Sequence, residues 1–387
     1  MDLATHRLLQ QRLLGVPHAR PEDVVEGLLA VQAQDFVGAK WGVSQRTADP
    51  DDAQAQRAYD EGHILRTHVL RPTWHFVSRA DIRWLLELSG PRVHALNAYY
   101  YRYHGVDAAL VKRSNARIVK VLSRGEHLTR AELGRGLGAL AGAAQTNGMG
   151  YRLACLLMRA ELDGLICSGK MRGTHHTYAL IEERAPHSAK LGRDETLAEL
   201  ARRYVDGHGP AQALDLAWWS GLPLREAKRA LEACGTSLTR TTLEGKTYFQ
   251  SAAPRSARRR GHAVHLLPYY DELVVAFKDR SALIDPHVTA KFSVPLAPSV
   301  LVDGRIVGSW RRTLVAREVV ISVRLLRPLS SAVQKQLGRA SARYANSLGL
   351  ACRLETELMP RAGLRDGNGS EVGRARSGAT AWPRVDL

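Results

Sequence analysis

The chain has 387 residues, of which 45% are hydrophobic and 24% are charged, so its composition is that of a globular protein and excludes a mainly disordered one. No apolar stretch is long enough to cross a bilayer, and the N-terminal stretch MDLATHRLLQQRLLG is too interrupted by charge to be a secretory signal. The 55 Lys and Arg residues against 38 Asp and Glu residues leave a net charge of +17, which favours a polyanionic partner whose counterions are released on binding.

The cysteines exclude two common kinds of small fold. Cys155, Cys167, Cys234 and Cys352 are far apart and have no CxxC spacing, so a zinc ribbon is excluded and a disulfide framework has no support. We expect free thiols in a reducing cytoplasm.

Three predicted helices followed by a predicted two-stranded hairpin occur three times along the chain. The first set has helices at 3–14, 21–32 and 51–62, and a hairpin of strands 64–70 and 73–78 that turns at Arg71-Pro72. The second has helices at 108–122, from 129 onward and at 149–162, and strands at 165–168 and 177–181. The third has helices at 195–205, 211–222 and 223–234, and strands at 236–241 and 246–250 that turn at Glu244-Gly245.

Local signals support these boundaries. Thr129 is a good N-cap and Glu132 follows three residues later, as a capping box requires. Pro223 stands at a favoured position for a helix start. Three helices with a hairpin form a winged helix, in which the third helix usually enters the major groove of DNA.

The charge and this architecture together predict that at least one unit contacts double-stranded DNA. The alternative is that the units are structural building blocks only. Candidate phosphate contacts are Lys170, Arg172, His175 and His176 in the basic loop 169–176, and Arg311 and Arg312.

After residue 261 the pattern changes to strands within 262–277, 299–313 and 318–326, with a turn at Asp303-Gly304, and a last amphipathic helix at 330–348. The basic run 255–260 and the tail after 361 are expected to be disordered. The predicted fold class is α+β, mainly helical, with tandem winged-helix units and a C-terminal β-rich segment. The expected domains are 1–105, 106–190, 191–260, 261–360 and the tail 361–387.

Several familiar catalytic sites are missing from the sequence, which has no Walker A loop, no GxSxG elbow and no HExxH. For His175-His176 a phosphate contact is favoured over a metal site. Asp271 and Glu272 are adjacent and would point to opposite sides of a strand, so they would not form an acid–base pair by themselves. We expect Asp271 to be buried in a salt bridge.

The segment VQAQDF (31–36) carries the most unusual pattern. On a continuing helix Gln32 and Gln34 would lie roughly 200° apart and could not share a site. They converge only if the helix ends or loosens, which Asp35, Phe36 and Gly38 make plausible. The alternative is a solvated polar end of a helix.

Four motifs in order, LLAVQAQDF, LRPTWHFVS, LLPYYDELVVAFKDRS and VDGRIVGSWRRT, resemble the AlkZ family of bacterial winged-helix DNA glycosylases. The resemblance extends from about Leu3 to Leu350. It implies a C-shaped assembly of tandem winged helices and a catalytic Gln-x-Gln motif at Gln32 and Gln34. This form of the motif resembles the branch linked to self-resistance against DNA-alkylating antibiotics such as azinomycin.

The implied activity is hydrolysis of the N-glycosidic bond of cationic alkylated purines, including unhooking of interstrand crosslinks, in DNA repair or self-resistance. A glutamine carbonyl can hold a water near C1′. A cationic base leaves without protonation, so neither a metal nor another cofactor is needed. The implied partner is double-stranded DNA with alkylated purines, and no membrane partner is expected. We expect a monomer in the cytoplasm, associated with the nucleoid.

A monofunctional reaction is expected because the lysine nearest the motif, Lys40, is predicted in a loop that faces solvent or phosphate. The alternative function is a non-enzymatic winged-helix DNA-binding protein or transcription regulator.

Overall fold

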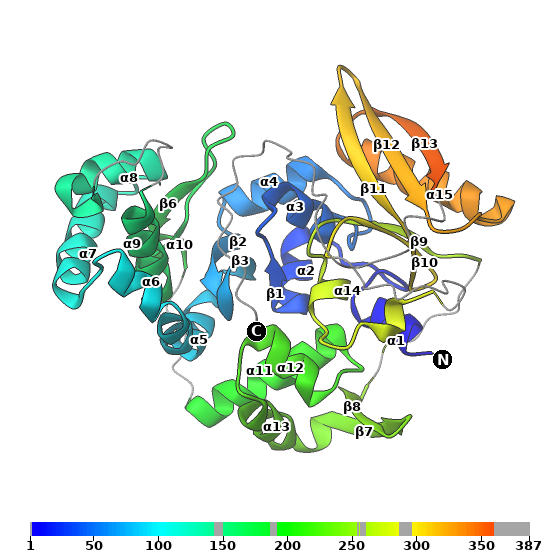
Figure 1. The fold of residues 1–387 in the computed structure, drawn as a ribbon, viewed down its shortest axis with the longest axis horizontal. Helices are drawn as coiled ribbons and strands as arrows, with labels where there is room; N and C mark the ends of the chain where they lie inside the picture. Colours follow the sequence, from blue (N-terminus) through cyan, green and yellow to red (C-terminus); the bar gives the residue numbers. More distant parts are fainter. Residues whose placement is uncertain are drawn as a thin grey trace.

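Helices and small sheets alternate along the chain in the predicted α+β class (Figure 1). The computed structural model describes residues 2–142, 150–185, 192–253, 255, 261–285 and 296–359. The predicted disordered tail 361–387 and most of the basic run 255–260 lie outside these residues. Arg255 is described and is not free, because its guanidinium donates to the backbone oxygens of Gln10 (3.1 Å) and Asp206 (2.7 Å).

The first unit, at the centre of the molecule (blue in Figure 1), contains a three-stranded sheet in the order β1-β3-β2. Its elements are α1 (Leu3–Gln10), α2 (Pro21–Leu28), β1 (Ala30–Gln32), α3 (Phe36–Ser44), α4 (Asp52–Asp60), β2 (Ile64–Val69) and β3 (Arg71–Ser78). The predicted hairpin of β2 and β3 is confirmed, but it turns at Leu70, whose φ is 63°, and not at Arg71-Pro72.

Two predictions for this unit are wrong. The helix expected over 21–32 ends at Leu28, Leu29 takes a φ of 66°, and the chain continues as strand β1. A short apolar run such as LLAV fits a strand as well as a helix, and pairing with β3 decides between them. Lys40 lies in α3 and not in a loop, with 8% of its surface exposed. Its Nζ lies 2.8 Å from Asp52 Oδ2, so Lys40 does not face solvent.

The second unit follows the predicted pattern closely, after two helices, α5 (Ile82–Leu96) and α6 (Ala98–Tyr103), that lead into it. Its elements are α7 (Ala108–Leu122), β4 (Leu128–Thr129), α8 (Arg130–Leu137), α9 (Tyr151–Leu162), β5 (Ile166–Ser168), β6 (Thr177–Leu180) and α10 (Ile181–Arg184). The capping box of Thr129 and Glu132 is confirmed. The strands form a sheet in the order β4-β6-β5.

The third unit has the predicted helices and hairpin. Its elements are α11 (Arg193–His208), α12 (Ala213–Ser220), α13 (Leu224–Ala233), β7 (Leu238–Leu243) and β8 (Lys246–Ser251). Glu244 and Gly245 both have positive φ, as the predicted tight turn requires. One hydrophobic cluster includes Leu65 and Val77 of the first unit and Leu200 and Trp219 of the third. These two units therefore share a core, while the predicted domain boundaries stay a prediction.

The C-terminal segment forms a five-stranded sheet in the order β13-β12-β11-β10-β9. Its elements are β9 (Val264–Leu267), α14 (Glu272–Val275), β10 (Ser299–Val302), β11 (Arg305–Val315), β12 (Glu318–Leu325), α15 (Ser331–Ser347) and β13 (Ala351–Leu358). The turn at Asp303-Gly304 and the last helix are confirmed. The strand expected to continue to residue 277 stops at Leu267, and a short helix follows it.

A buried ion pair joins this segment to the first unit. Arg46, just after α3, donates to both carboxylate oxygens of Asp271 over 2.8 and 2.9 Å, and both side chains are at most 1% exposed. Asp271 also caps α14, because its Oδ1 accepts from the Leu273 backbone nitrogen (2.9 Å). The expectation that Asp271 is buried in a salt bridge is confirmed.

We expect the change Asp271→Asn to lower the free energy of unfolding by about 3–5 kcal/mol, because it leaves the Arg46 charge buried and unpaired. Urea unfolding measures this change. The control is Glu357→Gln, which removes the exposed ion pair with Arg324 and should leave stability nearly unchanged. Equal effects of the two changes would contradict a structural role for the buried pair.

Candidate active site

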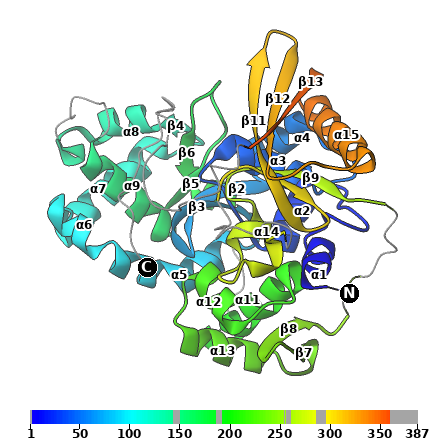
Figure 2. The same ribbon diagram turned by 45° about the vertical axis from the view of Figure 1, so that its right-hand side comes forward.

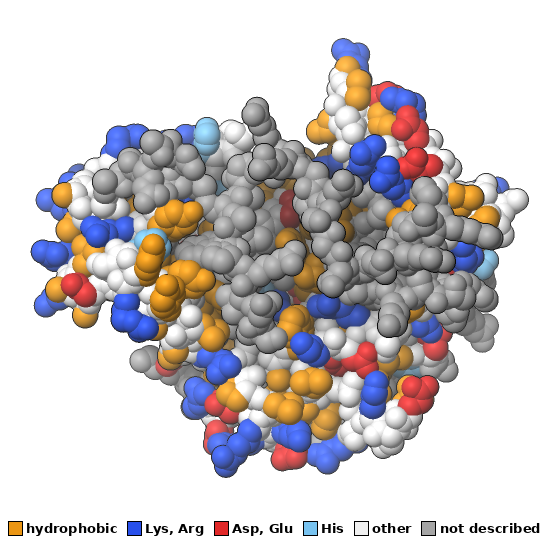
Figure 3. All heavy atoms as spheres, viewed as in Figure 1, with side chains coloured by type: hydrophobic (Ala, Val, Ile, Leu, Met, Phe, Trp, Pro, Cys, Tyr) orange, Lys and Arg blue, Asp and Glu red, His pale blue; other side chains and the backbone are white. Residues whose placement is uncertain are grey.

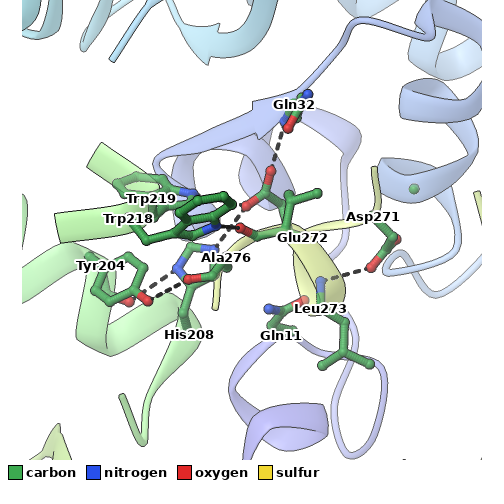
Figure 4. Close-up of polar contacts among 12 residues, drawn as sticks. Gln11, Gln32, Tyr204, His208, Trp218, Trp219, Asp271, Glu272, Leu273 and Ala276 are labelled. Carbon is green, nitrogen blue, oxygen red and sulfur yellow. Dashed lines mark hydrogen bonds and ion pairs between the residues drawn. The ribbon is translucent and has the colours of Figure 1, made fainter. Parts of the chain in front are cut away.

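Gln32 is the last residue of β1, and a buried carboxylate holds its backbone (Figure 4). Its backbone nitrogen donates to Glu272 Oε1 over 2.7 Å. Its side-chain Oε1 accepts from Arg71 Nη2 over 3.3 Å, and 8% of the residue is exposed. The Gln32 side-chain amide is therefore held by Arg71 of β3, and only a small part of the residue reaches the surface.

Gln34 follows the strand and is half-buried. Val31 and Ala33 belong to a hydrophobic cluster on one side of this segment. Gln32, between them, faces the other side of the strand, and Gln34 stands in the bend that leads from β1 to α3. The strand and bend take the place of the continuing helix on which the two glutamines could not share a site.

The peptide between the two glutamines is fixed by neighbouring strands. The Ala33 backbone nitrogen donates to the Trp74 carbonyl oxygen (2.8 Å), and Arg66 Nε donates to the Ala33 carbonyl oxygen (3.0 Å). The Arg66 guanidinium lies over the Trp74 ring, 4.4 Å from its centroid. These contacts restrict the backbone of the segment that contains the two glutamines.

Glu272 is 1% exposed, and sequence reasoning missed its place beside Gln32. Its Oε2 accepts from Trp219 Nε1 (3.0 Å) and lies 3.4 Å from His208 Nε2. Burial raises the pKa of Glu272, but the hydrogen bond and charge of His208 and the hydrogen bond from the Gln32 N–H together lower it by more. The net pKa lies below its ordinary value, so the carboxylate is ionised. Glu272 and Asp271 do point in different directions, but from the start of a helix and not from a strand (Figure 4).

Alternate residues of β3 place a further polar group beside Gln32. His75 is the direct cross-strand partner of Gln32, Thr73 lies two residues before it, and Arg71 reaches Gln32 Oε1 through its Nη2. Within the described part of the chain, three buried atoms here have no hydrogen-bond partner: Arg71 Nε, Thr73 Oγ1 and His75 Nε2. The alternation of RPTWH along a strand was the signal in the sequence that could have identified them.

His75 is fully buried, and its protonation state follows from its surroundings. Burial, with the nearby charge of Arg71, lowers its pKa to about 3. Its Nδ1 lies 3.0 Å from the Thr73 carbonyl oxygen, which can only accept, so Nδ1 carries the proton of the neutral ring. His75 Nε2 is therefore an acceptor with a free lone pair.

The basic loop 169–176 lies against the first unit, close to the glutamines. The Met171 backbone nitrogen donates to Asp60 Oδ1 (2.7 Å), and the His176 ring contacts Phe36 edge to face (centroids 4.7 Å apart). Burial lowers the pKa of His176 to about 4, so it is uncharged at neutral pH. This state does not fit the predicted phosphate contact by His176.

The other predicted contacts of this loop are exposed. Lys170 and His175 face solvent, and Arg172 is exposed but bonded to Glu132 (2.6 Å). Of the Lys and Arg residues of this loop, Lys170 and Arg172, one is thus already paired within the protein.

Arg311 and Arg312 lie on β11, in a long hairpin with β12 that extends beyond the rest of the molecule (Figure 2). Arg311 is exposed, whereas Arg312 donates to the Tyr344 hydroxyl. The hairpin tip exposes Leu314 (61%) and Val315 (45%). Figure 3 shows Lys and Arg side chains over the second unit on one side and over this hairpin on the other.

The described residues contain no cluster of three or more His, Cys, Asp or Glu side chains able to hold a metal ion. All four cysteines are free thiols. None of the described helices is long and apolar enough to cross a membrane.

Comparison with known proteins identifies the family. The family model described as DNA glycosylase AlkZ-like matches residues 25–347, which include both glutamines, the strand with His75 and Glu272. The chain belongs to the AlkZ-like family of DNA glycosylases. The resemblance predicted from the four motifs is confirmed.

AlkZ of Streptomyces sahachiroi is similar to this AlkZ-like chain in both sequence and solved structure. An interstrand DNA cross-link repair glycosylase is 26% identical over 332 residues, which are 81% of this chain and 87% of that protein. The solved structure of the DNA glycosylase AlkZ superposes with a TM-score of 0.71 at 24% identity, over 92% of this chain and 98% of that one. This superposition shows that the AlkZ-like chain shares its fold.

The low pKa of His75 makes stability depend on pH. Between pH 6.5 and about 3 the unfolded chain binds a proton at this residue and the folded chain does not, so stability is full above pH 6.5 and falls as the pH falls. We expect His75→Asn to reduce the loss of unfolding free energy between pH 6.5 and 5.5 by about 1 kcal/mol. Urea unfolding at both pH values measures it, with His175→Asn as the exposed control; an unaltered loss would mean that His75 is charged in the folded state.

Proposed function

We propose that the chain is a monofunctional DNA glycosylase that hydrolyses the N-glycosidic bond of cationic alkylated purines such as N7-alkylguanine. The family supplies the class of activity. The observation that carries the narrower proposal is that an ionised, fully buried carboxylate, Glu272, accepts a hydrogen bond from the backbone of Gln32, the first glutamine of the neutral pair.

This arrangement suits a base that leaves without help. Alkylation at N7 puts a positive charge on the purine, so the enzyme need not protonate it. The sugar gains oxocarbenium character, and the buried negative charge of Glu272 stabilises it across a medium of low dielectric. Both Glu272 oxygens already accept hydrogen bonds, so Glu272 acts through its charge and is neither nucleophile nor base.

The biological role that we propose is DNA repair or self-resistance against a DNA-alkylating antibiotic, including release of purines joined in interstrand crosslinks. The name of the 26% identical relative, an interstrand cross-link repair glycosylase, supports this role. The Gln-x-Gln form of the motif supports it as well. A neutral pair gives less help than a carboxylate base, which restricts activity to unstable cationic lesions.

We expect Gln32→Ala and Gln34→Ala each to slow base release from N7-methylated duplex DNA more than about tenfold, with nearly unchanged DNA affinity. Single-turnover release, followed by alkaline cleavage of the abasic product, measures the rate. Gln34→Asp is the informative variant, because it replaces one neutral amide of the pair with a carboxylate. Gln54→Ala, on the nearby helix α4, is the control.

If both alanine variants kept the wild-type rate, the catalytic assignment would fail. If the wild-type protein bound DNA but released no base, the alternative of a non-enzymatic winged-helix DNA-binding protein would stand in its place.

For DNA binding we propose a C-shaped surface that runs from the basic loop of the second unit to the hairpin of β11 and β12. Exposed Lys170, His175 and Arg311 on these two arms support it. The three helices and hairpin of the second unit have the order of a winged helix, and one duplex could contact both arms.

Duplex affinity should therefore fall with salt along a log–log slope of at least about −4. Lys170→Ala and Arg311→Ala should each make the slope shallower by about 1, and Arg172→Ala by less because of its bond to Glu132. Fluorescence anisotropy across a salt series measures the slopes. Lys246→Ala, on the β7–β8 hairpin of the third unit, is the control; equal slopes for all variants would place the DNA elsewhere.

The product should be an intact strand with an abasic site, because strand scission by a glycosylase requires a free amine to form a Schiff base. Lys40 is the lysine nearest the motif, and it is buried in its ion pair with Asp52. Borohydride trapping during turnover should give no covalent protein–DNA adduct. An adduct that disappears in Lys40→Ala would overturn the monofunctional mechanism.

A further inference from the structure

Three buried polar atoms without partners occur within five residues of one strand, Arg71 Nε, Thr73 Oγ1 and His75 Nε2. Buried polar groups are nearly always hydrogen-bonded to protein or to ordered water. A cluster of exceptions in the first residues of β3 therefore indicates a small polar site that a bound molecule completes.

The cluster adjoins the catalytic motif. His75 lies directly opposite Gln32 across the β1–β3 pair, so the two side chains share a face. Arg71, whose Nε is unpaired, also donates through Nη2 to Gln32 Oε1. The Arg71 and His75 side chains therefore both lie beside Gln32.

The chemistry of the atoms matches a water molecule. His75 Nε2 is a bare acceptor because Nδ1 carries the proton, Arg71 Nε is a donor, and Thr73 Oγ1 is both. A water that donates to Nε2 and accepts from Arg71 keeps a lone pair free.

We propose that Arg71, Thr73 and His75 bind the attacking water beside Gln32, and that His75 Nε2 accepts its proton. The inference rests on the proposed glycosylase function and adds a catalytic residue to it. The water oxygen bonds to C1′ of the sugar, and the C1′–N bond breaks with its electron pair moving to the purine, whose positive charge it cancels. The released proton passes to His75 Nε2 and from there to solvent.

The low pKa of His75 fits this role, because a weakly basic imidazole returns the proton at once and is neutral for the next turnover. A strong base is not required, since attack on an oxocarbenium-like carbon needs little deprotonation of the water.

Two substitutions of His75 distinguish the roles of its two ring nitrogens. Asparagine at 75 can still donate to the Thr73 carbonyl from the position of Nδ1 but has no acceptor at the position of Nε2. Glutamine offers an acceptor near that position. The matched control is His265→Asn, because His265 on β9 also has a low pKa, about 4, and a buried Nε2 without a described partner.

Under single turnover with N7-methylated DNA we expect H75N to be more than about tenfold slower than wild type, H75Q within about threefold, and H265N unchanged. Melting temperatures and DNA affinities of H75N and H75Q should agree with each other. Equal rates for H75N and H75Q, fast or slow, would overturn the inference. If H75N does not fold, T73V, which removes only the hydroxyl, should slow the reaction several-fold, and a wild-type rate for T73V would overturn the inference.

A second measurement needs no turnover. Duplex DNA with a 1-aza-2′-deoxyribose unit presents a cationic mimic of the reacting sugar, which a water held by His75 Nε2 would contact through its lone pair. The protein's binding preference for this duplex over an ordinary duplex should fall about tenfold in H75N and be kept in H75Q. If the wild type releases no base, the proposed function fails while this comparison still decides the inference: equal preferences in wild type, H75N and H75Q overturn it.

Discussion

Two consecutive buried carboxylates at the start of α14 hold the active site together. Asp271 turns to Arg46 at the end of α3, and Glu272 turns the other way to the Gln32 backbone and Trp219. Each carboxylate is fully desolvated, which is unfavourable unless hydrogen bonds and charges compensate. Because both are compensated by segments far away in the chain, a single turn of helix fixes the first unit, the third unit and the C-terminal sheet relative to one another.

This tie also explains why a weak pair of amides can be sufficient. In the proposed reaction the glutamines contribute position, whereas the negative charge of Glu272, held by hydrogen bonds from the Gln32 backbone and Trp219, opposes the developing sugar cation. The backbone of Gln32 is fixed from one side by Glu272 and from the other by β3, so little reorganisation is needed when DNA binds.

Sequence reasoning succeeded where the signal was local. The helix at Ala108–Leu122, the capping box of Thr129 and Glu132 and the tight turns at Glu244-Gly245 and Asp303-Gly304 all depend on residues a few positions apart. It failed where distant contacts decide. Strand β1 has only three residues, and its pairing with β3 overrode an apolar run that equally suited a helix. Gln32 and Glu272 are 240 positions apart, and no pattern in the sequence joins them.

Strand β13 was not predicted, because its exposed residues give neither an apolar stripe nor turn signals. It pairs in parallel with β12 and is the outermost strand of its sheet, so its unpaired backbone groups could recruit a strand from another molecule. Arg353, Glu355 and Glu357 alternate along it: Arg353 pairs with Glu318 across the strands and with Glu355 on its own strand, and Glu357 pairs with Arg324. A second chain added at this edge would have to strip water from these charges, so the edge resists aggregation at the high local concentrations that a protein reaches along DNA.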